Sequence, residues 1–263
     1  MPGGTGGPVG DQAQKLIDAL RADDERLWHL LQDSDRQVLL NLLKNPALNE
    51  EHLLALLRRR DLDEEILKKL YQARREGASH RVLVAMARHP NLPAPMALAL
   101  LPHLYLFELL DICLLPGHTS DQRIAAERQI VKRLPEIPLG QKITLARRAT
   151  PGILAALVGE GRAQTLAACL DNPHLKEAAL LQFLRGANAS ADTISMIARH
   201  PRWQNRPQLR LAILKHPRTP MVWYLAWKRQ LNRAQISELL ASRRLPASRR
   251  RQLQELFRSG SRR

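Results

Sequence analysis

Apolar residues recur along the chain at the spacing of an amphipathic helix. In segments such as 51–57 and 235–240 they stand at positions i, i+3 and i+4, on one face of a helix. No polar–apolar alternation persists between turn signals and no Asn-Gly hairpin turn occurs, so the strand signals are missing. Prolines and glycines, 17 and 13 in number, interrupt the pattern often enough to keep each helix short. The pattern therefore predicts an all-α protein of about 15 helices.

A turn signature recurs between the predicted helices. It is an Asn-Pro or His-Pro pair, which begins at Asn45, His89, Asn172, His200 and His216. Each pair predicts a helix end, because the residue before a proline is pushed out of the α region. Asn and His exchange in the same slot, so we expect their side chains to hydrogen-bond exposed helix-end groups rather than to hold a metal.

The turns also indicate an internal duplication. Residues 45–104 and 172–231 align at an offset of 127 without a gap, with 16 identities in 60 positions. Helical units that cannot bury an apolar face alone stack on their neighbours, which predicts a right-handed α-solenoid of short antiparallel helix pairs. The expected division is a disordered leader (1–10), a first repeat half (11–135), connecting helices (136–170), a second, basic repeat half (171–258) and a disordered tail (259–263).

The spacing of 44 residues between successive turns resembles HEAT and armadillo repeats, whose period is about 40–47 residues. The Leu-rich helices between Asn-Pro and His-Pro turns also resemble leucine-rich repeat variant proteins. Segments 198–203 (ARHPRW), 211–220 (LAILKHPRTP) and 240–251 (LASRRLPASRRR) look similar to bacterial helical-repeat proteins of uncharacterised function. The resemblance covers residues 37–258 and implies an architecture, not a function. Some leucine-rich repeat variant proteins carry an N-terminal cysteine cluster for an iron–sulfur centre, but no cysteine precedes Cys113 here.

The positive charge is concentrated at one end of the chain. The formal net charge is +16, from 41 Lys and Arg against 25 Asp and Glu. Residues 1–198 hold 24 basic and 23 acidic residues, a net of +1, whereas 199–263 hold 17 and 2, a net of +15. Fifteen of those 17 are Arg, which suits bidentate contacts to phosphate or carboxylate. The alternative is an arginine-rich genome that places Arg on solvated helix faces.

The candidate polyanion-binding residues are the basic side chains of this segment and a tryptophan beside them. They are Arg199, Arg202, Trp203, Arg206, Arg210, Lys215, Arg218, Lys228, Arg229, Arg233, Arg243, Arg244, Arg249, Arg250 and Arg251. Trp203 could stack on a base or pack the turn between helices. Trp223 and Trp227, four residues apart, are expected to pack the core as one helical face.

The sequence offers no catalytic motif. It has no phosphate-binding Gly-rich loop, Gly-x-Ser-x-Gly elbow, His-Glu-x-x-His or Cys-x-x-Cys. Cys113 and Cys169 stand in apolar helical contexts and are expected to be buried. The acidic runs 23–25 and 63–65 are expected to open helices. We therefore expect no enzyme, cofactor, metal or small-molecule substrate. The remaining enzymatic alternative is a DNA glycosylase built from HEAT-like repeats, and the active-site pattern of that class cannot be matched residue by residue in this sequence.

These observations favour a non-enzymatic helical-repeat binding module whose basic C-terminal quarter docks on a polyanion: RNA, the ribosome or the DNA backbone. The alternative is a protein–protein interaction scaffold that binds an acidic protein partner. An anionic membrane surface ranks third, on the strength of the Arg-rich last helix and tail. A cytoplasmic location is expected, because no apolar run of 18 residues and no signal-peptide pattern occur.

Overall fold

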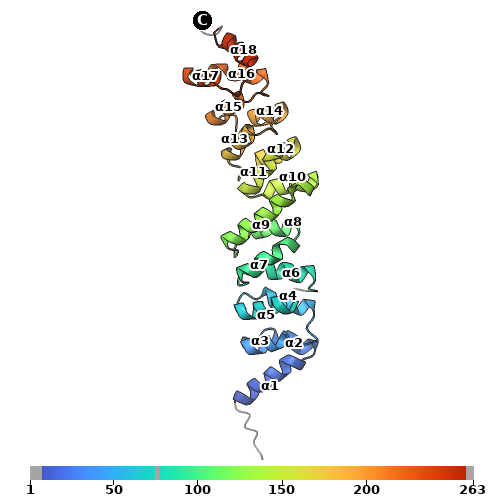
Figure 1. Cartoon of the computed structure of the whole chain (residues 1–263). Coiled ribbons are helices and arrows are strands. Elements are labelled where there is room, and N and C mark those ends of the chain that lie inside the picture. The colour runs from blue at the N-terminus through green and yellow to red at the C-terminus, as the bar shows by residue number, and fades with distance from the viewer. Residues whose placement is uncertain (1–7, 75–76, 259–263) are drawn as a thin grey trace, which may run out of the picture. The chain divides into compact units, whose positions relative to one another are not determined.

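The computed structural model describes residues 8–74 and 77–258, and every regular element in that range is a helix (Figure 1). The all-α prediction is confirmed for these residues, which form 18 α-helices and three 3₁₀ turns. Residues 1–7 of the expected leader and the expected tail lie outside the described residues, and the first helix begins at Pro8. The chain divides into two compact units, 1–130 and 131–263.

Unit 1 contains nine α-helices in its described part, the last of which runs three residues past its end. They are α1 (Pro8–Arg21), α2 (Asp24–Leu30), α3 (Arg36–Leu42), α4 (Glu50–Arg58), α5 (Glu64–Arg74), α6 (His80–Ala87), α7 (Ala94–Leu100), α8 (Leu106–Leu114) and α9 (Ser120–Arg133). The 3₁₀ turn η1 (Leu101–His103) follows α7 directly.

Unit 2 repeats this order in its described residues. Its helices are α10 (Leu139–Arg148), α11 (Pro151–Gly159), α12 (Ala163–Asp171), α13 (Glu177–Arg185), α14 (Ala191–Arg199), α15 (Pro207–Leu214), α16 (Met221–Trp227), α17 (Arg233–Leu240) and α18 (Ala247–Arg258). The 3₁₀ turn η2 (Leu134–Glu136) precedes α10, and η3 (Lys228–Gln230) follows α16 as η1 follows α7.

The helix starts extend the duplication beyond the segment aligned by sequence. The first residues of α2 to α9 lie 127 positions before those of α11 to α18, and η1 and η3 differ by the same offset. Segment 136–170, expected to hold connecting helices, contains α10, α11 and nearly all of α12, which take in unit 2 the places of α1, α2 and α3 in unit 1. The two units therefore share one succession of nine helices.

Within each unit, helices pack chiefly on the helix two positions along the chain. In unit 1, α1 packs on α3, α3 on α5, and α4 on α6. In unit 2, α10 packs on α12 and α12 on α14, while α11, α13, α15 and α17 form a second succession, visible along one side of that unit in Figure 1. Buried Leu, Ile, Val and Ala side chains fill the core between them, as the low aromatic content of 4% requires.

The asparagines of the turn signature join helix ends. The Nδ2 of Asn45, which follows α3, donates to the carbonyls of Ala19 and Ala22 at 3.0 and 3.1 Å, at the end of α1. The Nδ2 of Asn172, which follows α12, donates to the carbonyl of Ala146 in α10 at 2.7 Å. Each buried amide thus satisfies carbonyls left open at the end of the helix two positions earlier.

The histidines of the His-Pro turns also contact groups at the ends of earlier helices. The Nε2 of His89 lies 2.8 Å from the carbonyl of Arg59 at the end of α4, and its Nδ1 accepts from the backbone N–H of Asn91 at 3.2 Å. His200 instead reaches the carboxylate of Asp171, the last residue of α12, at 3.1 Å. The predicted helix-end role is confirmed for His89, whereas His200 contacts a side-chain carboxylate.

The acidic runs open helices as expected. Asp23 caps α2 by accepting from the backbone N–H of Arg26 at 3.1 Å, and Asp63 accepts from the backbone N–H of Ile66 at 2.9 Å, in the first turn of α5. Carboxylates at these positions satisfy open N–H groups and favour the positive end of the helix dipole.

Candidate functional site

The predicted binding residues gather at the helix ends and connections of unit 2, from the end of α14 into α18. Arg199 closes α14, Arg206 is the residue before α15, and Arg233 opens α17. Segment 249–251 lies in the first half of α18. Some of these side chains are bound to backbone carbonyls, rings or carboxylates of their own unit. Others are exposed and make no side-chain contact to the described residues.

Arg202 is bound to the connection between α12 and α13. Its Nη1 donates to the carbonyl of Asn172 at 2.7 Å. Its Nη2 donates to the carbonyls of Pro173 and Leu175, each at 3.0 Å. The guanidinium carbon also lies 4.5 Å from the ring centroid of Trp203, within the range of a cation–π contact. Arg202 therefore joins the α14–α15 connection to the α12–α13 connection.

Trp203 packs inside unit 2 and does not face solvent. Only 3% of its surface is exposed, and its Nε1 donates to the carbonyl of Leu170 at 3.3 Å. A base cannot stack on a ring covered in this way, so Trp203 leaves the candidate binding set. Trp227 is also buried and lies 5.2 Å from Trp223 between ring centroids, which confirms that this pair packs together.

Arg218 and Arg244 are fixed at other helix ends of unit 2. Arg218 donates to two carbonyls of the α13–α14 connection, at 2.9 and 3.0 Å. Arg244 donates to the carbonyl of Leu184, near the end of α13, at 2.8 Å. Burial, together with the charges of these two arginines, lowers the pKa of His216. A guanidinium at a helix C-terminus binds open carbonyls and complements the dipole.

Other members of the predicted set are held by rings or by an acid. Arg210 lies 5.3 Å over the ring of Trp227, and burial lowers the pKa of its guanidinium. Lys215 forms an ion pair with Glu238, one of the two acids in residues 199–263.

Backbone carbonyls hold two further members of the predicted set. Arg199 donates to the carbonyl of Ser195, and Lys228 donates to the carbonyl of Leu256. Arg249 lies over the ring of Tyr224, and the Nε of Arg250 is buried.

Five arginines of the predicted set are exposed and make no side-chain hydrogen bond, ion pair or ring contact to the described residues. They are Arg206, Arg229, Arg233, Arg243 and Arg251, hereafter the free arginines of unit 2. Their charge is not neutralised within the described part of the unit. A guanidinium in this state keeps its full set of donors for a ligand.

The structure adds a feature that the sequence did not single out: an open basic groove that occurs in both units. The groove of unit 1 has a volume of about 440 Å³ and is lined by residues of α4, α6 and α8 and of the turns after α4 and α6. The groove of unit 2 has a volume of about 320 Å³ and is lined from α13, α15 and α17. Equivalent pairs at the offset of 127 include Leu54 with Leu181, Arg58 with Arg185, and Arg88 with Lys215.

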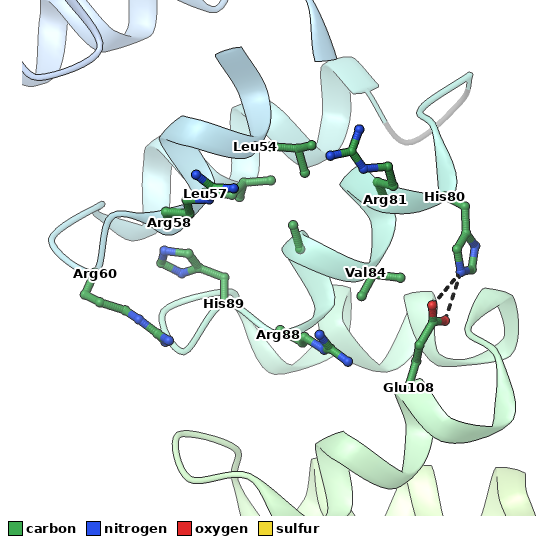
Figure 2. A pocket seen from close by; sticks show the side chains of 11 residues that line it. Leu54, Leu57, Arg58, Arg60, His80, Arg81, Val84, Arg88, His89 and Glu108 are labelled. Atoms are coloured by element: carbon green, nitrogen blue, oxygen red, sulfur yellow. Dashed lines mark hydrogen bonds and ion pairs between the residues drawn. The ribbon is translucent and has the colours of Figure 1, made fainter. Parts of the chain in front are cut away.

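Figure 2 shows the side chains of the unit 1 groove arranged around an open space. On one side His80 meets Glu108, with its Nε2 2.9 Å from each carboxylate oxygen. On the other side, burial and the nearby charge of Arg60 act against protonation of His89 and lower its pKa. The one acid that lines this groove is thus paired with a histidine.

An ion pair at each groove is also duplicated. The Nη2 of Arg88 lies 2.6 Å from the carboxylate of Asp111 on α8, and Lys215 pairs with Glu238 on α17. Both partners differ by the offset of 127. The offset could have been used to predict the groove of unit 1 from the sequence, because it relates the basic positions of unit 2 to positions in unit 1. The net charge gave no indication of this groove, because acidic and basic residues nearly balance before residue 199.

Neither cysteine is poised for chemistry. Cys113 and Cys169 are buried, as expected, and burial raises the pKa of each thiol to about 12. In residues 8–74 and 77–258, no group of three or more His, Cys, Asp or Glu side chains could hold a metal ion.

Comparisons of the chain with protein-family models, with curated proteins and with solved structures find no match. Among the described residues, no helix combines the length and the apolar character needed to span a membrane.

Proposed function

We propose that the chain is a non-enzymatic α-solenoid, of the kind that HEAT-like repeats form, whose basic C-terminal quarter docks on a polyanion such as RNA, the ribosome or the DNA backbone. Contacts between every second helix support the solenoid. So do the Asn and His turns, whose hydrogen bonds join the ends of helices two positions apart. Such arrays bury a continuous core and leave long surfaces for binding.

The free arginines of unit 2 carry the proposal. An arginine that is already satisfied by backbone carbonyls, as Arg202 is, has a structural reason to be present. Arg206, Arg229 and Arg233 have no such partner among the described residues, and each stands at a helix end or connection. Exposed guanidinium groups in a segment with a net charge of +15 attract phosphate oxygens and release counterions.

Backbone binding of this kind depends on salt and little on base sequence. If all five free arginines contact phosphates of a single strand, affinity falls about a hundredfold between about 50 and about 200 mM salt. The burial of Trp203 supports the same conclusion, because it removes the aromatic stacking that would add base contacts. We expect RNA and DNA of different sequence to bind with similar affinity.

Fluorescence anisotropy with labelled RNA and labelled DNA tests the proposal. The variant Arg206→Gln, Arg229→Gln, Arg233→Gln should lose most of the affinity at about 50 mM salt. The matched control, Arg21→Gln, Arg26→Gln, Arg128→Gln, removes the same charge from exposed positions of unit 1 and should bind as the wild type does. Absence of binding at the lower salt refutes the proposal.

The alternative function, a scaffold for an acidic protein partner, makes a different prediction. A scaffold keeps its protein partner in a pull-down from nuclease-treated lysate, whereas a nucleic-acid binder loses the material that it recovered. The proposal for unit 2 therefore requires that nuclease treatment empties the pull-down.

A further inference from the structure

The groove of unit 1 joins an apolar floor to a cationic rim. Leu54, Leu57 and Val84 contribute apolar surface from α4 and α6. Arg58 and Arg60 contribute the rim on one side of the opening (Figure 2). Both arginines are exposed and make no side-chain hydrogen bond or ion pair to the described residues. Two free guanidinium groups beside an apolar surface form a site for a ligand that is both acidic and apolar.

Other cations of this groove are held in place by acids outside it. Arg81 binds Glu51 and Glu50 with its Nη1, at 2.8 and 3.1 Å. Arg88 binds Asp111, and the Nε of Arg88 is buried with no partner atom. These contacts fix the wall of the groove and leave its attraction for anions to Arg58 and Arg60.

The equivalent groove of unit 2 is lined by one long side chain that unit 1 lacks. There the side chain of Arg244 lines the groove and donates to the carbonyl of Leu184 at 2.8 Å. The residue 127 positions earlier in unit 1 is Gly117, which has no side chain to line the groove. The groove of unit 1 is correspondingly larger, about 440 Å³ against about 320 Å³.

We propose that the groove of unit 1 binds an acidic segment of a partner protein, which sets carboxylates against Arg58 and Arg60 and an apolar side chain on Leu54 and Val84. Arginine matches carboxylates in bidentate geometry, and the apolar floor gains from burying a leucine-like side chain. This site lies in unit 1 and does not rest on the function proposed for unit 2.

The charge of unit 1 favours a peptide over a nucleic acid. Residues 1–130 contain 16 Lys and Arg and 18 Asp and Glu, a net of −2, so the unit has no long-range attraction for phosphates. Two local cations suffice for a peptide that carries a few carboxylates. An apolar floor contributes to the binding of an apolar side chain, whereas a sugar–phosphate backbone has nothing equivalent to bury.

Fluorescence anisotropy with the full chain tests this site. The probe is a short fluorescein-labelled peptide in which glutamates flank leucines. The variant Arg58→Gln, Arg60→Gln should bind it about tenfold more weakly than the wild type. The matched control Arg21→Gln, Arg26→Gln removes two exposed charges of unit 1 outside the groove and should keep the wild-type affinity. Circular dichroism of each variant checks that it is folded.

Two further comparisons separate this site from the arginines of unit 2. Affinity for the peptide should persist in the Arg206→Gln, Arg229→Gln, Arg233→Gln variant, which is designed to lose RNA. Peptides with Gln in place of Glu, or Ser in place of Leu, should each bind more weakly. The first change removes the carboxylates that contact the arginines, and the second removes the apolar side chains that pack on the floor of the groove.

Three results would overturn the proposal. One is the absence of saturable peptide binding, and another is an unchanged affinity in the Arg58→Gln, Arg60→Gln variant. The third is a labelled RNA that loses affinity in this variant while the peptide does not bind, which would assign the groove to nucleic acid. None of them bears on the RNA affinity lost by the unit 2 variant, so the two proposals fail separately.

Discussion

Replacing Arg202 by Ala should destabilise unit 2 without acting through a ligand. The side chain makes three hydrogen bonds to carbonyls of the α12–α13 connection and lies over the ring of Trp203. All of these contacts disappear in Arg202→Ala. Nearby Arg206 is also exposed but has no side-chain partner among the described residues, so Arg206→Ala removes the same charge and no contact.

The expected loss follows from the number and the exposure of these contacts. Because Arg202 is exposed, each hydrogen bond is placed at the low end of the usual range, about 0.5 kcal/mol, and water can replace it at the carbonyl. The cation–π contact adds about 0.5 kcal/mol at an exposed site. The total is about 2 kcal/mol in the free energy of unfolding, which lowers the thermal midpoint of a unit of this size by about 6 °C.

Urea unfolding followed by tryptophan fluorescence measures this change in the full chain. Three of the four tryptophans, Trp203, Trp223 and Trp227, lie in unit 2, so the signal reports mainly on that unit. Arg202→Lys should recover only a small part of the loss, because an ammonium cannot reproduce the guanidinium fork. A midpoint that is unchanged in Arg202→Ala, or that moves as far in Arg206→Ala, would refute the division into structural and free arginines.

Other predictions concern the turns and a buried ion pair. His89→Asn should keep most of the stability, since Asn occupies the same position at other turns. His89→Ala should lower the free energy of unfolding by about 1–3 kcal/mol, because it leaves a helix-end carbonyl unpaired. Urea midpoints compare the two variants. Burial lowers the pKa of His89 and His216, so below about pH 6.5 the unfolded chain binds protons that the folded chain does not, and stability falls on acidification. The urea midpoint should therefore drop between about pH 7 and about pH 5, less steeply in His89→Asn, His216→Asn, and a midpoint that rises would contradict the assignment. Lys142 is 1% exposed and its Nζ lies 2.6 and 2.8 Å from the carboxylate oxygens of Glu160, so Glu160→Gln should cost about 3 kcal/mol in urea unfolding. Adding Lys142→Met should restore most of that loss; a double variant as unstable as Glu160→Gln would show that the unpaired ammonium is not its cause.

Local patterns in the sequence were sufficient to predict the all-helical fold and the helix ends at the Asn-Pro and His-Pro turns. Asn172 and His89 mark helix ends because of the proline that follows, and their hydrogen bonds reach the helix two positions earlier. The offset of 127 was visible in residues 45–104 because the turns there are identical in both copies. The sequence did not show it at α11, where the helix start is kept while the side chains have changed.

The use of each arginine could not be predicted in the same way. Arg202 and Arg206 are the same residue type, four positions apart, and only the path of the turn brings Arg202 against three carbonyls. The groove of unit 1 was hidden for a related reason. Acids that pair with Arg81 and Arg88 balance the charge count of this unit, while Arg58 stays free at the surface. Net charge along a sequence does not distinguish paired from unpaired cations.

The salt dependence of RNA binding tests the central claim most directly. For a single strand, the slope of log affinity against log salt is about −0.7 for each phosphate contact. The Arg206→Gln, Arg229→Gln, Arg233→Gln variant should therefore show a slope shallower than that of the wild type by about 2. The wild-type slope should be kept by the Arg21→Gln, Arg26→Gln, Arg128→Gln control. Equal slopes and equal affinities for the wild type and the unit 2 variant would contradict the claim that these free arginines bind the polyanion.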